Sequence, residues 1–234
     1  MRPTLPALLS MLLVVAVTCV ALVGVIAMVH SYGTSSAIES GVGVAILLAV
    51  SWFLWRRGRR ASRGTDSPTV ERAIVLGVCL GMLWVVEIGV NNFLAPPLAA
   101  RDILDDVFWA VIAASILGYA SLQGYRTNSV VRGIEVGTWS GFVSGLFACA
   151  MALSVVVFGM RFITHDPLNV AEWAERGASS RAPGMAAYFA FETYAGALGH
   201  LLVLGLAMGA LLGTAGGSLG KVLWRAVGLR RGVR

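Results

Sequence analysis

The sequence predicts an all-helical integral membrane protein with about six transmembrane helices and with both termini in the cytoplasm. The first two observations that predict this class are the balance of apolar over charged residues and the length of the apolar runs. Apolar residues make up 57% of the chain and charged residues only 13%, and several apolar runs exceed the ~18 residues that mark a membrane helix. The third observation is that basic residues lie in the gaps between these runs. We expect the protein in the cytoplasmic membrane of a bacterium.

The first two apolar runs predict an N-terminal pair of transmembrane helices over residues 1–55. The run at 7–29 is longer than the apolar core of a signal peptide, and only Arg2 precedes it, so we expect a membrane helix. Cleavage of this run as a signal is the alternative, and it would leave five spans. A basic linker at 56–72 follows, and its segment Arg56–Arg63 would attract anionic lipid headgroups.

Four further apolar runs predict a four-helix transmembrane bundle over residues 73–220, at 73–94, 107–122, 134–160 and 185–215. An acidic loop is expected at 99–106. In the longer loop at 161–183, Asp166 followed by Pro167 predicts the start of a short surface helix, and Gly177 its end. A basic cytoplasmic tail is expected at 221–234.

The basic residues predict the orientation of these spans. With six spans and a cytoplasmic N-terminus, all but four of the 18 lysines and arginines fall on the cytoplasmic side. The four on the far side are Arg101, Arg161, Arg176 and Arg181.

The bundle contains a pattern that resembles an internal repeat. The pattern R-x-I-x-x-G-x-x-x-G occurs at 72–81 and again at 132–141, at the start of the third and fifth spans. It predicts a parallel repeat of a two-helix unit, an arrangement that some transporters have. Chance recurrence of membrane-helix glycines is the alternative.

Glycines at a spacing of four residues predict close contacts between helices. In lipid, small residues let two backbones approach, and van der Waals contact then holds the helices together. The predicted helix-packing residues are Gly77, Gly81, Gly137, Gly141, Gly205, Gly209, Gly213 and Gly217.

Polar residues inside two of the apolar runs predict a binding site. Such residues are costly in a membrane and commonly functional. Glu87 lies roughly 20 Å from the cytoplasmic end of its span and Glu192 roughly 10 Å from the outer start of the last span, which gives them a similar depth. We expect an ion or substrate site formed by Glu87, Asn91, Asn92, Glu192 and His200. Hydrogen bonds between helices, without any ligand, are the alternative role.

These features favour a small permease or transport subunit with a cation- or proton-linked site in the outer half of the membrane. The alternative is a non-catalytic scaffold or sensor that binds a membrane-protein partner, or a second copy of itself, through its glycine faces. No enzyme motif, nucleotide-binding loop or metal-ligand spacing occurs in the sequence. We therefore expect no enzymatic activity, cofactor, metal or nucleic-acid partner; an enzyme acting on lipid would need a nucleophile that the sequence does not identify.

Overall fold

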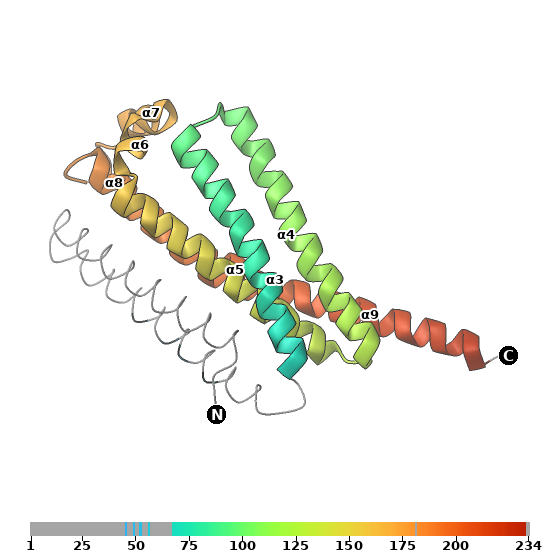
Figure 1. Cartoon of the computed structure of the whole chain (residues 1–234). Helices are drawn as coiled ribbons and strands as arrows, with labels where there is room; N and C mark the ends of the chain where they lie inside the picture. Colours follow the sequence, from blue (N-terminus) through green and yellow to red (C-terminus); the bar gives the residue numbers. More distant parts are fainter. Residues whose placement is uncertain are drawn as a thin grey trace.

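The computed structural model describes residues 67–180 and 182–232, together with the single positions 45, 49, 52 and 56. The described chain is helical apart from short turns (Figure 1). Its elements are α3 (Ser67–Gly89), η1 (Val90–Leu94), α4 (Leu98–Thr127), α5 (Val130–Phe158), α6 (Met160–His165), α7 (Pro167–Arg176), α8 (Met185–Gly199), η2 (His200–Ala207) and α9 (Met208–Gly232), where η denotes a π-helix. Apart from those single positions, the predicted N-terminal pair and the linker before Ser67 lie outside the described residues.

Four helical stretches in the described part are long and apolar enough to cross a membrane. They are Pro68–Leu94, Leu98–Thr127, Val130–Phe158 and Met185–Val227. The prediction of an all-helical membrane protein is confirmed at this level, and these stretches match the last four predicted spans. Six spans and cytoplasmic termini stay predictions.

α5 is the central helix of the bundle. Buried residues make up 67% of its most apolar window but only 17% of the corresponding window of α4. α3 packs along α5, and η2 and α9 also pack along α5 (Figure 1). α4 packs mainly on α9, and it makes few contacts with α3, although a short turn joins the two helices. Exposed apolar side chains on α4, such as Ile103, Val107 and Val111, suit a lipid-facing surface.

Glycines bring α5 and the last helix into backbone contact. Gly205, Gly209, Gly213 and Gly217 are all buried. A Cβ placed at Gly209 would lie 2.5 Å from the carbonyl oxygen of Gly137, and one at Gly213 would lie 2.6 Å from that of Gly133. Any side chain larger than hydrogen would therefore force these two helices apart.

The other predicted packing glycines lie against α5 or belong to it. A Cβ at Gly77 would lie 2.7 Å from the Cβ of Val143, and one at Gly81 would lie 2.6 Å from the Phe147 ring. Gly141 instead faces the Gly205 backbone. The two glycine pairs of the proposed sequence repeat therefore contact different partners.

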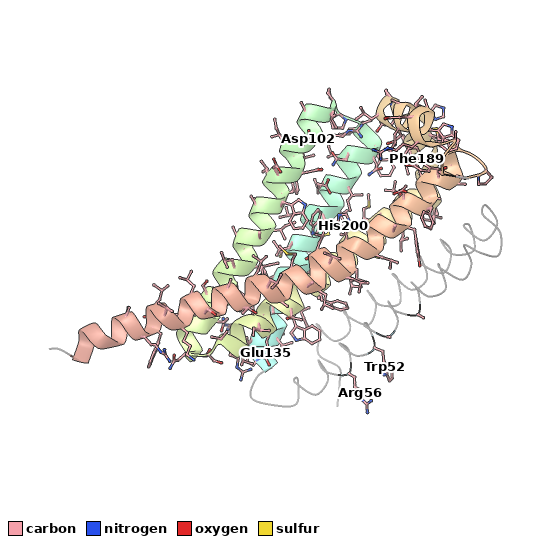
Figure 2. All side chains as sticks on the ribbon, turned by 180° about the vertical axis from the view of Figure 1, so that it is seen from behind. Trp52, Arg56, Asp102, Glu135, Phe189 and His200 are labelled. Atoms are coloured by element: carbon pink, nitrogen blue, oxygen red, sulfur yellow. The ribbon has the colours of Figure 1, made fainter. Side chains whose placement is uncertain are left out.

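The last helix is longer than its apolar run. α8, η2 and α9 continue one another as a single tilted rod (Figure 2). The helix does not end near residue 220, and the predicted basic tail is helical as far as Gly232. Basic residues near a helix C-terminus interact favourably with the helix dipole, so charge there does not stop the helix.

The predicted acidic loop at 99–106 is wrong, because α4 begins at Leu98 and includes these residues. An apolar run marks the part of a helix inside lipid, whereas acidic residues near a helix N-terminus are favourable and extend the helix beyond that run. The short helix predicted after Asp166 is present as α7, and its place at the membrane surface stays a prediction. The Asp166 side chain accepts a hydrogen bond from the Leu168 amide at 3.1 Å, and Gly177 follows the last helical residue.

Candidate functional site

A cavity of about 290 Å³ lies among α3, η1, α4, α5, α8 and η2. Its wall combines two acids, two amides, a hydroxyl, a histidine and two tryptophans with small apolar side chains. The lining residues are Trp84, Glu87, Ile88, Asn91, Asn92, Asp105, Trp109, Ala152, Val155, Thr193, Gly196, Ala197 and His200.

One asparagine bridges two carboxylates from different helices. Asn91 Nδ2 donates to Glu87 Oε1 at 2.5 Å and to Asp105 Oδ1 at 2.9 Å. The two carboxyls therefore lie on either side of a single amide nitrogen. Glu87 is only 6% exposed, so its charge is withdrawn from water. Two carboxyls this close repel each other when both are ionised, and a shared proton or a bound cation relieves that repulsion.

Helical spacing explains why these side chains meet. Glu87 and Asn91 are four residues apart and share one face of the helix. Trp84 precedes Glu87 by one turn, and on α4 Trp109 follows Asp105 by one turn. The same pairing of an acid with a tryptophan one turn away therefore lines the cavity from both helices.

Both π-helical segments border this cavity. Asn92 of η1 donates from Nδ2 to the Ile88 carbonyl at 2.8 Å, and the His200 Nδ1, at the start of η2, lies 2.8 Å from the Gly196 carbonyl. In each case a side chain bonds the carbonyl four residues back, where it competes with the regular helical hydrogen bond. Interruptions of this kind re-aim side chains and are frequent at functional sites.

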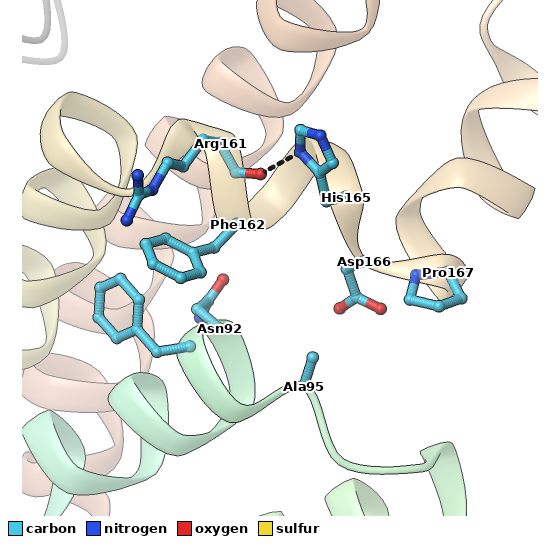
Figure 3. A pocket seen from close by; sticks show the side chains of 8 residues that line it. Asn92, Ala95, Arg161, Phe162, His165, Asp166 and Pro167 are labelled. Carbon is cyan, nitrogen blue, oxygen red and sulfur yellow. Dashed lines mark hydrogen bonds between the residues drawn. The ribbon is translucent and has the colours of Figure 1, made fainter.

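A second cavity, of about 370 Å³, adjoins the first at the α7 end of the bundle (Figure 3). Asn92 lines both cavities. Near it, Arg101 donates to Asp166 at 2.6 Å and to the Pro96 carbonyl at 2.7 Å. This ion pair joins the turn between α3 and α4 to the start of α7. The structure therefore ties this end together through buried polar contacts.

Four of the five predicted site residues line the first cavity: Glu87, Asn91, Asn92 and His200. Figure 2 shows His200 midway along the bundle. Glu192 does not line this cavity; it is exposed on α8, one turn after Tyr188. The acid beside Glu87 is Asp105.

Asp105, Trp84 and Trp109 line the cavity but are not among the predicted site residues. Asp105 falls in the segment predicted to be an acidic loop, although its spacing of four from Trp109 is the signal of a shared helix face. The tryptophans carried no signal by themselves, because aromatic residues are common at membrane interfaces.

The described residues contain no group of three or more histidine, cysteine or acidic side chains placed to hold a metal ion. No protein-family model matches this chain, and no curated protein or solved structure is significantly similar to it. The fold and the cavity define a class: a helical protein that has, within residues 67–232 as described, four stretches able to cross a membrane and a polar cavity among them.

Proposed function

We propose that this protein is a small permease, or the transport subunit of one, with a cation- or proton-linked site. The observation that carries the proposal is the Asn91 bridge between Glu87 and Asp105 inside a cavity of a membrane bundle. A buried Glu87 beside a second carboxyl is costly in a membrane, and a cation or proton that binds and leaves gives the pair a use. His200 and Thr193, from the facing helix, supply further polar groups to the same cavity.

The scaffold alternative receives less support. It relies on glycine faces that are free to bind another helix. Gly209 and Gly213, the proposed docking positions, lie against Gly137 and Gly133 of the same chain. A partner helix would need a different surface.

Proton movement across a membrane tests the proposal. Purified full-length protein would be reconstituted into liposomes loaded with the pH-sensitive dye pyranine, and Na⁺, K⁺ or small ammonium ions would be added outside; the change in protein-free liposomes, where neutral amine crosses the bilayer unaided, is subtracted. We expect a cation-dependent change of internal pH that Glu87→Gln abolishes. Glu175→Gln, which changes an exposed acid on α7, is the matched control and should behave as wild type. Equal proton movement in wild type and Glu87→Gln, or none with any cation, would contradict the proposal.

A further inference from the structure

The aromatic part of the cavity narrows the class of ligand. The Trp84 and Trp109 rings meet edge to face with centroids 5.1 Å apart, and Trp84 makes a second such contact with His200, also at 5.1 Å. Trp84 is buried, at 4% exposed, and Glu87 lies one turn further along the same helix. Tryptophan faces attract organic cations, and the attraction is stronger where water is excluded.

The polar part of the cavity is rich in hydrogen-bond acceptors. The Asn91 amide donates to both carboxylates, while its buried Oδ1 has no hydrogen-bond partner. Glu87 and Asp105 each carry a second oxygen that Asn91 does not use. A primary ammonium group has three N–H donors and no acceptor, so it matches such a set.

The size of the cavity argues against a bare inorganic ion. A water molecule occupies ~30 Å³ of liquid, whereas this cavity measures about 290 Å³. Apolar Ala152, Val155 and Ala197 complete its wall and suit a hydrocarbon substituent. A small organic molecule with one charged end fits both parts of the cavity.

We propose that the cavity binds a small primary organic ammonium ion. Glu87 and Asp105 balance its charge and accept its N–H groups through the oxygens that Asn91 does not use. The rings of Trp84 and Trp109 pack against the carbon substituent and attract the positive charge of the ammonium group. This inference rests on the proposed function, because it names the cation of the same site.

Equilibrium binding to the purified full-length protein, by isothermal titration calorimetry, tests the ligand class. The probes are 2-phenylethylammonium, its neutral counterpart 2-phenylethanol, and its N,N,N-trimethyl derivative, which keeps the charge but has no N–H donor. We expect saturable binding of 2-phenylethylammonium, about tenfold or more weaker binding of the trimethyl derivative, and no measurable binding of the alcohol. Equal binding of all three, or no binding of the primary ammonium at millimolar concentration, would overturn the proposal.

Two substitutions locate the binding. Glu87→Gln removes a charge, and Gly196→Leu adds a large side chain at a position of α8 that lines the cavity, where an added Cβ has no neighbour within 4 Å and the fold is spared. Each should weaken binding of 2-phenylethylammonium at least tenfold. The matched controls are Glu175→Gln and Gly199→Leu; Gly199 has equal space but does not line the cavity. Unchanged binding in Gly196→Leu, with a wild-type elution profile, would place the ligand elsewhere and refute the proposal.

The binding and proton assays fail separately. Proton movement driven by Na⁺ or K⁺, without binding of 2-phenylethylammonium, would refute the ligand class and leave the permease proposal standing. Binding that Gly196→Leu abolishes, without any proton movement, would support the ligand class and refute the permease proposal.

Discussion

The contact between α5 and α9 and the cavity beside α3 and α4 are built from side chains of very different size. At the first, glycines face glycines, and only van der Waals contact between backbones holds the helices. At the second, tryptophans, acids and asparagines hold the helices apart around about 290 Å³ of space. α5 takes part in both, with Gly137 at the contact and Val155 at the cavity. The comparison shows how one bundle can pack its helices tightly in one region and keep a cavity between them in another.

Breaking the tight contact should have the largest effect. Gly137→Leu would drive a side chain into the Gly209 and Gly213 backbone, which cannot rotate away. We expect a loss of about 3 kcal/mol or more of folding free energy, the upper range for overpacking. Loss of the monodisperse peak in fluorescence-detected size-exclusion chromatography would report this loss of folded protein. Gly118→Leu is the control, because an added Cβ there has no neighbour within 4 Å. Equal behaviour of the two variants would refute the packing account.

Removing the ion pair and the cap at the start of α7 should have the next largest effect on stability. Asp166→Ala removes the partner of Arg101 and the cap of α7 together. Because Asp166 is 4% exposed, we expect a loss of about 2 kcal/mol. A lower thermal denaturation midpoint in detergent would report it, and Asp102→Ala, at an exposed position on α4, should leave the midpoint unchanged. A wild-type midpoint for Asp166→Ala would mean that the ion pair does not hold this end.

Neutralising the acid pair should change stability in the opposite direction. Glu87→Gln keeps an acceptor for Asn91 but removes the charge that repels Asp105. We expect a neutral effect or a gain of about 1 kcal/mol, as at sites where function is kept at the expense of stability. The thermal midpoint in detergent measures this as well. A loss as large as that of Asp166→Ala would indicate that Glu87 serves as structural glue.

A partly exposed ion pair beside the glycine contact should matter least, because neither of its side chains lies in that contact or lines the cavity. Arg132 and Glu135 form an ion pair at 2.9 Å on the first turns of α5, with side chains 26% and 28% exposed. Glu135→Gln should change the thermal midpoint by the equivalent of about 0.5 kcal/mol or less. A larger effect would show that the start of α5 is more tightly constrained than its exposure suggests.

Much of the fold is predictable from the sequence because lipid imposes simple rules. Apolar runs locate the four described membrane-length stretches, and glycine spacing locates positions where helices touch. The start of α4 was not predictable in this way, since hydropathy reports depth in lipid and not the helix end. The π-helical turns at Asn92 and His200 likewise depend on side-chain contacts that no periodicity reveals.

The site was predictable in part for the same reason. Polar residues inside apolar runs stand out, so the sequence points to Glu87, Asn91, Asn92 and His200, which the structure brings to one cavity. Which acid lies beside Glu87 depends on how the helices rotate and cross. Depth alone favoured Glu192, whereas the packing brings Asp105 to Glu87 and leaves Glu192 exposed.

The central claim is that Asp105, and not Glu192, lies beside Glu87. Crosslinking in native membranes tests this claim most directly. Cys19, Cys79 and Cys149 would first be replaced by serine or alanine. Glu87→Cys would then be combined with Asp105→Cys in one variant and with Glu192→Cys in another. Dibromobimane bridges only thiols that lie close together and fluoresces when both of its ends have reacted. The account predicts fluorescence for the pair at 87 and 105 and none for the pair at 87 and 192. The reverse pattern would contradict it.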